Sequence, residues 1–298
     1  MKTQKQHSDN PDAPTCLKPL LSDAFLYVVL FSGGRTSAFL AKYVKENPIY
    51  KNSIFVFMNT GKELEETLIF ANKCDKEFGL NLVWLEAKIN YPLGVGTTYT
   101  ITDFKNAKRN SEPFESMLKK YPMPNNAASN CTRELKQRPR EAFIRDNYSD
   151  CNIKTIIGIR HDERHRMAKN YEKENIIYPL INEIRVDSKF IRNWWSRQNF
   201  DLGLKDYQGN CDLCFKKSLK KRLTIIKEKP KIADWWLQME TKYSSDEIPR
   251  FDLRTNKSIQ QLIDLSKLKF TTAKDLHELS QNEKELFEYE TDCFCKSS

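Results

Sequence analysis

The sequence predicts an α/β fold: a parallel β-sheet with helices on both faces, followed by a helical C-terminal extension. Three observations predict it. Continuous apolar runs are typical of strands buried on both faces, segments with helical spacing lie between them, and glycines stand where strand gives way to helix. This alternation implies right-handed crossovers between parallel strands. The chain has 298 residues, enough to bury a sizeable core.

The first strand is expected at Ala24 to Phe31, a run of β-branched, aromatic and other apolar residues. It ends at Ser32-Gly33-Gly34. From Thr36 the apolar residues follow helical spacing, and Pro48 stops the helix. These features predict a unit of strand, glycine turn and helix.

The second and third strands follow the same plan. Ile54 to Met58 reads as a buried strand, closed by Asn59-Thr60-Gly61. An amphipathic helix is expected from Glu63 to Phe78, with Gly79 at its C-terminal stop. Leu82 to Leu85 is the third strand, so the pattern continues as β-α-β-α-β.

The periodicity weakens from Asn90 to Asn130, where we expect a long excursion with one short helix around Pro113 to Lys120. Glu134 to Arg145 looks helical, with a kink or restart at Pro139. Thr155 to Ile159 predicts a fourth strand.

Three regions are expected along the chain: a polar N-terminal arm (1–23), a nucleotide-binding α/β domain (24–215) and a basic helical region with a cysteine-containing tail (216–298). Within the domain, the charged segment Arg160 to Arg166 is a loop or a helix start. Ser188 is positioned to cap a helix.

Several large or apolar side chains are assigned to the interior. The pairs Trp194-Trp195 and Trp235-Trp236 are expected to pack in a core or interface rather than stack on bases. Cys16 and Cys74 have no partner pattern, so buried apolar thiols are expected.

The net charge is +9, from 49 Lys and Arg against 40 Asp and Glu, which favours anionic partners. No signal or transit peptide is visible in residues 1–23, and the strongest apolar run is far short of the ~20 residues that cross a bilayer. Eight cysteines are too sparse for a secreted disulfide framework. We expect a soluble, cytoplasmic protein with no membrane contact.

The segment Ser32 to Ser37 carries the strongest functional signal. Its glycines let backbone N–H groups approach an anion, the helix dipole favours negative charge, and its hydroxyls add donors. The segment lacks the Gly-Lys-[Ser/Thr] of P-loops and the Gly-x-Gly-x-x-Gly of dinucleotide sites. It predicts a pyrophosphate-sized cradle, and the alternative is a plain β–α turn with a serine cap.

Cys211-x-x-Cys214 leaves four interpretations open from the residues alone: half of a zinc site, part of an iron–sulfur site, a redox pair or coincidence.

The Ser-Gly-Gly-x-x-Ser loop resembles the PP-loop of the adenine nucleotide α-hydrolase-like superfamily, which includes N-type ATP pyrophosphatases and phosphoadenylyl sulfate (PAPS) reductases. Further segments resemble the PAPS reductase branch, in the order of that family. They are Asn59-Thr60-Gly61 with Glu66-Thr67, Cys131 to Lys136, Gly158 to Arg166, Tyr178-Pro179-Leu180, and Gly209 to Cys214. The resemblance spans about Phe25 to Cys214.

The resemblance implies a binding site for ATP with Mg²⁺, or for PAPS or its relative APS. Arg160 and Arg166 would clamp phosphate or sulfate and act in catalysis, because a guanidinium fork matches such oxyanions. The residues that would bind the nucleotide are Ser32, Gly33, Gly34, Arg35, Thr36, Ser37, Asn59, Thr60 and Gly61.

Some relatives implied by the resemblance hold a [4Fe–4S] cluster on cysteines. Cys131, Cys211 and Cys214 match three ligand positions, and the fourth would be Cys295 or its neighbour in the tail, or Cys151, or an open iron position. The resemblance favours this cluster over zinc, and free thiols are the remaining alternative.

Cys293 and Cys295 lie where PAPS reductases carry a nucleophilic cysteine, although this chain lacks their Glu-Cys-Gly-x-His motif. Either thiolate would attack an electrophilic sulfur. The alternative is a tail without function.

The resemblance implies an adenine-nucleotide-dependent enzyme, for which we favour sulfur transfer: ATP adenylates an acceptor, and a cluster-bound or persulfide sulfur displaces AMP. One alternative is a PAPS or APS reductase that makes sulfite. Another is a nucleotide-binding regulatory or defence-associated module without turnover. The partners left open are a tRNA or DNA acceptor, a redox or sulfur-donor protein, and a second copy of the chain in a homo-oligomer.

Overall fold

The computed structural model describes residues 25–125, 128–209, 211–243 and 257–275. The predicted arm 1–23, Cys16, Cys293 and Cys295 lie outside these ranges.

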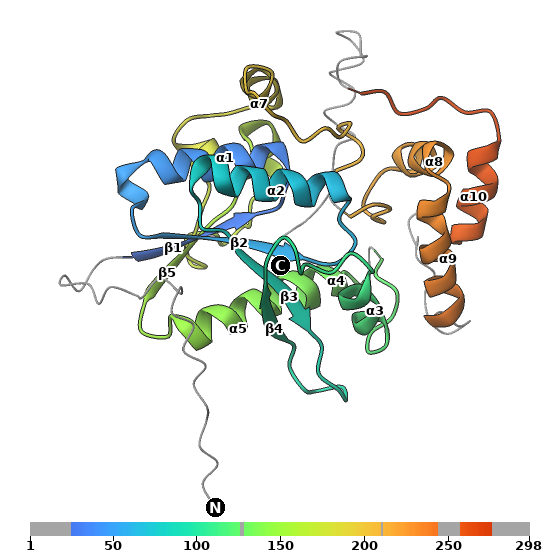
Figure 1. Ribbon diagram of the computed structural model, residues 1–298, viewed down its shortest axis with the longest axis horizontal. Helices are drawn as coiled ribbons and strands as arrows, with labels where there is room; N and C mark the ends of the chain where they lie inside the picture. The colour runs from blue at the N-terminus through green and yellow to red at the C-terminus, as the bar shows by residue number, and fades with distance from the viewer. Residues whose placement is uncertain (1–24, 126–127, 210, 244–256, 276–298) are drawn as a thin grey trace, which may run out of the picture.

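Strands and helices alternate from β1 to β3, β4 follows β3 directly, and a group of helices ends the described chain (Figure 1). The strands are β1 (Phe25–Phe31), β2 (Ser53–Asn59), β3 (Val83–Lys88), β4 (Thr98–Thr102), β5 (Asn152–Ile156) and β6 (Ile176–Ile177). The α-helices are α1 (Arg35–Glu46), α2 (Glu65–Phe78), α3 (Glu112–Leu118), α4 (Asn130–Thr132), α5 (Arg138–Asn147), α6 (Pro179–Asn182), α7 (Ser188–Trp195), α8 (Leu219–Glu228), α9 (Lys231–Tyr243) and α10 (Ile259–Lys267). Short 3-10 helices are η1 (Pro48–Tyr50) and η3 (His161–Arg166), and a π-helical turn is η2 (Arg133–Gln137).

Within the described residues the strands form one sheet in the order β4-β3-β2-β1-β5-β6. Every neighbouring pair is parallel except β3 and β4. The predicted α/β fold is confirmed, and the sheet is mixed because of its antiparallel edge strand. β4 was not predicted, because its sequence Thr-Tyr-Thr-Ile-Thr lacks an apolar run and lies inside the 90–130 excursion.

The fourth predicted strand was placed about three residues too late. β5 begins at Asn152, opposite Phe25 of β1, and ends at Ile156. Ile159, which made the later segment look like a strand, instead packs beside Tyr178 in a separate apolar cluster.

Helices cover both faces of the sheet, as predicted. On one face Val29, Phe55 and Trp84 pack with residues of α1, α2 and α7. On the other face Val28 and Leu85 belong to a cluster that includes residues of α5. Successive side chains of a strand point to opposite faces of the sheet. Since helices cover both faces, residues on each face are buried and are apolar.

Two helix starts refine the predictions. α7 is capped by Asp187, whose carboxylate accepts a hydrogen bond of 2.7 Å from the Phe190 N–H, so the assignment of Ser188 as the cap was wrong. The expected restart at Pro139 is confirmed, because the π-helical turn gives way to α5 with Pro139 in its first turn. Proline fits there because its missing N–H has no helical partner to lose.

Helices follow the sheet as the sequence predicts, and they share a core with the 90–130 excursion. Met117 of α3 packs in one cluster with Trp236 of α9 and Leu262 of α10. The expected burial of the tryptophan pairs is confirmed, since Trp195 and Trp236 are 2% and 1% exposed and their neighbours pack against the cores. Cys74 is fully buried, as expected. The division at residue 216 stays a prediction.

No helix in the described ranges combines the length and the apolar character that a membrane crossing needs.

Candidate functional site

The segments singled out by the sequence meet at the carboxyl ends of the parallel strands. β2 and β3 extend the sheet on one side of β1, and β5 and β6 extend it on the other. The strand order therefore reverses at β1, and ligands of open α/β sheets bind in the crevice at such a point. The loops after β1 and β5 form its two walls.

The loop after β1 is folded around the hydroxyl of Ser37. The Ser37 Oγ accepts hydrogen bonds from the backbone N–H groups of Ser32 and Gly34, at 3.1 and 3.2 Å, and from the Ser32 hydroxyl at 3.0 Å. It donates to the Gly34 carbonyl at 2.9 Å. No acidic residue stands in the first turn of α1. The N–H groups and dipole at the start of α1 favour an anion here, while the N–H groups of Ser32 and Gly34 hold the loop together through Ser37.

Gly33 is required by its backbone conformation and by its surroundings. Its φ is +77°, and a Cβ at this position would lie 2.5 Å from the Cγ2 atom of Thr67 in α2. The Ser-Gly-Gly loop and the Glu66-Thr67 pair, which the resemblance treats separately, are therefore in contact.

Gly33→Ala is expected to lower the free energy of unfolding by about 2–4 kcal/mol, since it adds backbone strain and a steric clash. Urea denaturation measures the change. Gly79→Ala is the matched control, because Gly79 also has a positive φ but has open space around it. Combining Gly33→Ala with Thr67→Ser should restore part of the loss. Equal losses for Gly33→Ala and Gly79→Ala would contradict the clash.

Arg160 joins the loop after β5 to the loop after β1. Its Nη1 lies 3.3 Å from the Thr36 hydroxyl oxygen, while Nε and Nη2 each lie 3.0 Å from the carboxylate of Asp162. Burial alone would lower the pKa of Arg160, but the Glu163 and Asp162 carboxylates raise it above the usual value. A fixed positive charge therefore stands against the glycine loop. Gly158 lies against α1, where a Cβ would come within 3.3 Å of the Leu40 side chain.

Arg166 is connected to the same group through Glu163. One carboxylate oxygen of Glu163 lies 3.3 Å from Nη1 of Arg160, and the other accepts a 2.5 Å hydrogen bond from Nη1 of Arg166. The structure thus places Arg160 at the loop and links Arg166 to Arg160 through Glu163. The acids that hold them, Asp162 and Glu163, were missed, although their place within the Arg160–Arg166 segment is a signal for ion pairing.

Asn59 and Thr60 are buried and shape their own turn. The Asn59 amide donates to the Glu86 carboxylate at 2.6 Å and to the Lys108 carbonyl at 2.9 Å. The N–H and hydroxyl of Thr60 both donate to Glu63. Gly61 has a φ of +75°. These hydrogen bonds fix the conformation of the turn. The binding of a nucleotide by Asn59, Thr60 and Gly61 stays a prediction.

Lys62 and Asp212 form a buried ion pair that attaches this turn to the C-terminal helices. The Nζ of Lys62 lies 2.8 Å from the Asp212 carboxylate and 4.1 Å from the ring centroid of Trp235. The Trp236 indole donates to the same carboxylate at 2.9 Å. Sequence analysis missed the pair, because Lys62 and Asp212 lie far apart in the chain.

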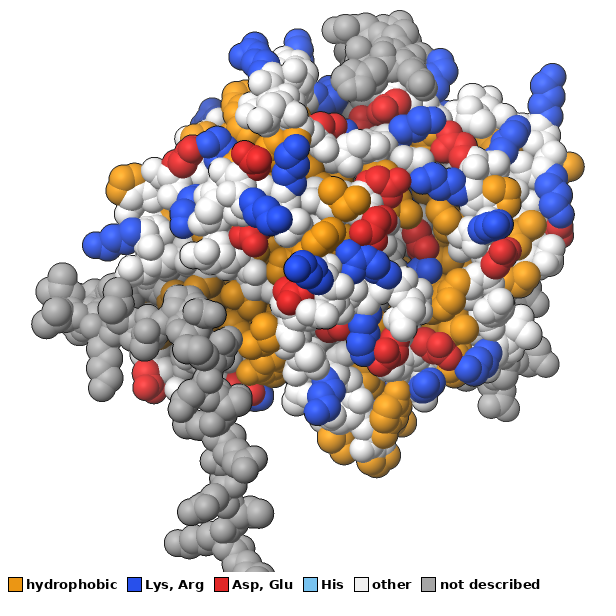
Figure 2. All heavy atoms as spheres, in the orientation of Figure 1, with side chains coloured by type: hydrophobic (Ala, Val, Ile, Leu, Met, Phe, Trp, Pro, Cys, Tyr) orange, Lys and Arg blue, Asp and Glu red, His pale blue; other side chains and the backbone are white. Residues whose placement is uncertain are grey.

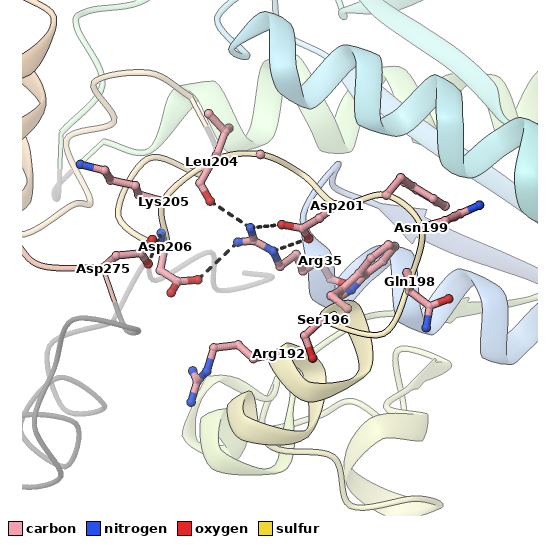
Figure 3. A pocket seen from close by; sticks show the side chains of 13 residues that line it. Arg35, Arg192, Ser196, Gln198, Asn199, Asp201, Leu204, Lys205, Asp206 and Asp275 are labelled. Atoms are coloured by element: carbon pink, nitrogen blue, oxygen red, sulfur yellow. Dashed lines mark hydrogen bonds and ion pairs between the residues drawn. The ribbon is translucent and has the colours of Figure 1, made fainter.

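Arg35 belongs to the glycine loop by its backbone, but its side chain lines a neighbouring cavity of about 520 Å³ (Figure 3). Its guanidinium makes two hydrogen bonds to Asp201, of 2.7 and 2.5 Å, donates to the Leu204 carbonyl at 3.1 Å and lies 3.5 Å from Asp206. In this arrangement Arg35 anchors the segment 201–206 behind the loop. Its predicted contact with the nucleotide stays a prediction.

Asp206 makes this anchor sensitive to pH. Burial, together with the neighbouring Asp275, raises the pKa of Asp206 from 3.8 to about 6, while Arg35 and Arg192 act to lower it. The folded protein thus binds this proton more tightly than the unfolded chain does. The stability that the protonated carboxyl contributes is complete below about pH 4 and is lost as the pH rises through about 6.

Asp206→Asn is therefore expected to remove a decline of about 1–3 kcal/mol in the free energy of unfolding between pH 4 and pH 6. Urea denaturation of both proteins across this range measures it. The measured quantity is the difference in free energy of unfolding between the wild type and Asp206→Asn at each pH. Other carboxyl groups titrate in both proteins, so their contribution cancels in this difference. Parallel curves would refute the assignment.

Within the described ranges, the predicted ligands Cys131, Cys211 and Cys214 do not gather into a group that could hold a metal ion. Cys211 lies 3.7 Å from the Thr60 hydroxyl, and burial, with Glu63 nearby, raises the pKa of its thiol to about 12. Cys131 is close enough to contribute to that shift, and Cys214 packs against the C-terminal core. Cys151 precedes the amino end of β5, at the opposite edge of the sheet.

A [4Fe–4S] cluster or a zinc ion needs several thiolates or imidazoles around one point. Across the described ranges, no three side chains of His, Cys, Asp or Glu gather in a way that could hold a metal ion. The donor set of Cys131, Cys211 and Cys214 therefore does not fit the cluster that the resemblance implies. Cys295 lies outside the described residues.

The segments described above lie largely within a region that is similar to known proteins. The family model for the phosphoadenosine phosphosulfate reductase domain matches residues 26–186, which include the glycine loop and the arginine segment. A similar curated protein is the "Uncharacterized nin region protein ORF290" of Escherichia phage lambda, 36% identical over 198 residues, or 65% of this chain and 67% of that protein. Another is the "Uncharacterized protein MJ0066" of Methanocaldococcus jannaschii, 25% identical over 161 residues, or 53% of this chain and 28% of that protein.

Proposed function

The chain belongs to the phosphoadenosine phosphosulfate reductase family, and on this premise we propose that it is an enzyme that binds ATP on its glycine loop, adenylates an acceptor and supports replacement of the adenylate by sulfur. The two relatives named above are uncharacterized, so the reaction is inferred from the site. Membership of this family supports a nucleotide as the substrate of this chain.

One observation carries the proposal: the anion cradle at Ser32–Ser37 faces a buried arginine from the next strand. The N-terminus of α1, with its dipole and its first N–H groups, and the Arg160 guanidinium at Thr36 lie at one crevice. Positive groups fixed before the ligand arrives stabilise charge that develops on phosphate oxygens, because they need no reorganisation during the reaction. This suits a step in which pyrophosphate leaves.

In the proposed first step, an acceptor oxygen attacks the α-phosphorus of ATP. The bond from that phosphorus to the oxygen bridging the β-phosphorus breaks, and the electron pair leaves with pyrophosphate. Mg²⁺ would accompany ATP and neutralise part of the phosphate charge. Arg160 and Arg166 would hold the charged oxygens in place.

In the second step, the terminal sulfur of a persulfide on a separate donor protein attacks the acceptor carbon, and the carbon–oxygen bond to AMP breaks. A second thiol of the donor then cleaves the sulfur–sulfur bond, leaving a disulfide on the donor. Cys211 takes no part in this proposal, because its raised pKa keeps it as the neutral thiol, which is a poor nucleophile.

The net charge of +9 supports an anionic acceptor such as tRNA or DNA. Figure 2 shows Lys and Arg side chains interleaved with Asp and Glu on the face it displays. The described residues on that face show no single basic patch, so the support for an anionic acceptor comes from the net charge of the whole chain.

The test is product analysis with α-labelled ATP, Mg²⁺ and bulk tRNA or DNA. Labelled AMP, or label transferred to the nucleic acid, together with pyrophosphate, supports the proposal. ADP with phosphate contradicts it. A parallel reaction with PAPS or APS, thioredoxin and a reductant tests the reductase alternative, which sulfite would favour. Stable nucleotide binding without any product would instead favour a regulatory module.

A further inference from the structure

The carboxylate of Glu163 lies between the two arginines of the candidate clamp. Its Oε2 is 3.3 Å from Nη1 of Arg160, and its Oε1 is 2.5 Å from Nη1 of Arg166. The side chain is 12% exposed, and those of both arginines are 16% exposed. A carboxylate with its two oxygens on two guanidinium groups has the charge and geometry with which a phosphate or sulfate edge binds arginine.

Arg160 has enough partners without Glu163. Asp162 binds it through two nitrogens at 3.0 Å, and the Thr36 hydroxyl oxygen is a further neighbour at 3.3 Å. The Glu163 contact is an additional ion pair on the one nitrogen that also faces the glycine loop. Its loss would leave Arg160 held in the same place.

Arg166 is under-satisfied by comparison. Its Nη1 donates to Glu163, whereas its Nε is buried and has no hydrogen-bond partner among the described residues. A buried N–H without an acceptor is unfavourable, and the cost is greater for a charged group. This atom is a donor for which none of the described residues supplies an acceptor.

We propose that Glu163 is an internal counter-ion, which occupies the space between Arg160 and Arg166 in the free protein and is displaced by an anionic group of the ligand. The inference rests on the proposed function in one respect, namely that the glycine loop binds nucleotide phosphates. On displacement, ligand oxygens replace the carboxylate at Arg160 and Arg166, and Arg166 Nε gains its missing acceptor.

This exchange makes the site selective. A small anion that displaces Glu163 would gain only the contacts with the two arginines in return. A polyphosphate contacts the glycine loop and the arginines together, so it gains enough to displace the carboxylate. Competition of this kind discriminates against the wrong ligand as well as for the right one.

Glu163→Gln is the direct test, read by titration calorimetry with ATP and, separately, with inorganic pyrophosphate. Removing the competing charge should lower both dissociation constants on the order of tenfold. Glu174→Gln removes the same charge at an exposed position further along the chain and should leave both constants unchanged. Combining Glu163→Gln with Arg166→Gln should abolish the gain, because the gain requires Arg166.

The outcomes separate the two proposals. Wild-type protein that binds ATP, with a Glu163→Gln variant that binds no more tightly, overturns the counter-ion and leaves nucleotide binding intact. Weaker binding together with a lower melting temperature in that variant would identify Glu163 as a structural support and likewise overturn it. Absence of ATP binding in the wild type, Glu163→Gln and Glu174→Gln proteins would overturn both proposals.

Discussion

Asp212→Ala is expected to lower the free energy of unfolding by about 3–5 kcal/mol, because it leaves Lys62 as an unpaired charge in the interior. The side chains of Lys62 and Asp212 are 7% and 11% exposed. The variant also removes the acceptor of the Trp236 indole N–H. Urea denaturation followed by far-UV circular dichroism measures the loss.

Two controls assign the effect to the buried charge. Asp264→Ala breaks an ion pair with Lys267 whose side chains are 58% and 69% exposed, and it should cost less than about 1 kcal/mol. The double variant Lys62→Met/Asp212→Leu removes both charges and should recover most of the stability lost in Asp212→Ala. If the double variant is no more stable than the single one, the unpaired lysine is not the cause.

The second large effect is expected at Gly34. This residue is the N-cap of α1 with extended backbone angles, φ −99° and ψ 162°, which any residue adopts. A Cβ there would have the Ser32 hydroxyl oxygen as its nearest neighbour, at 3.8 Å. Substitution at Gly34 therefore changes the cradle without straining the loop, unlike substitution at Gly33.

Gly34→Asp should lower the affinity for ATP on the order of 100-fold while leaving the protein at least as stable. Aspartate is a favourable N-cap for a helix, but its carboxylate would occupy the region where the nucleotide phosphates are expected and repel them. Titration calorimetry measures the affinity, and thermal unfolding measures the stability.

Gly34→Ser is the matched variant for this test. Serine is also a good N-cap and adds a side chain without charge, so the difference between Gly34→Asp and Gly34→Ser isolates electrostatic repulsion. Equal ATP affinity in wild type and Gly34→Asp would place the nucleotide away from this loop.

The elements predicted correctly are those whose signal is local. The runs Phe25–Phe31 in β1 and Ile54–Met58 in β2 are apolar at every position because both faces of the sheet are covered. The glycine loop is recognisable because a tight strand-to-helix turn needs glycine at a positive φ, as Gly33 has. β4 and β6 carry no such signal, since one is polar and the other is only two residues long.

The cysteines illustrate the opposite case. Cys131, Cys211 and Cys214 match the spacing of a cluster-binding relative, yet the described residues assemble no metal site. Spacing along a chain places cysteines in order but does not say which of them meet. The fold places Cys211 beside Thr60 and packs Cys214 against the C-terminal core.

The sequence by itself determined the α/β fold, the position of the glycine loop and the segment that carries Arg160 and Arg166, because each depends on neighbouring residues. Only the tertiary structure decided the partners of the charged groups. Arg35 pairs with Asp201 across 166 positions, and Arg160 reaches Thr36 across 124. Charged side chains are long and accept any opposite charge, so their partners depend on which loops the packed sheet brings together.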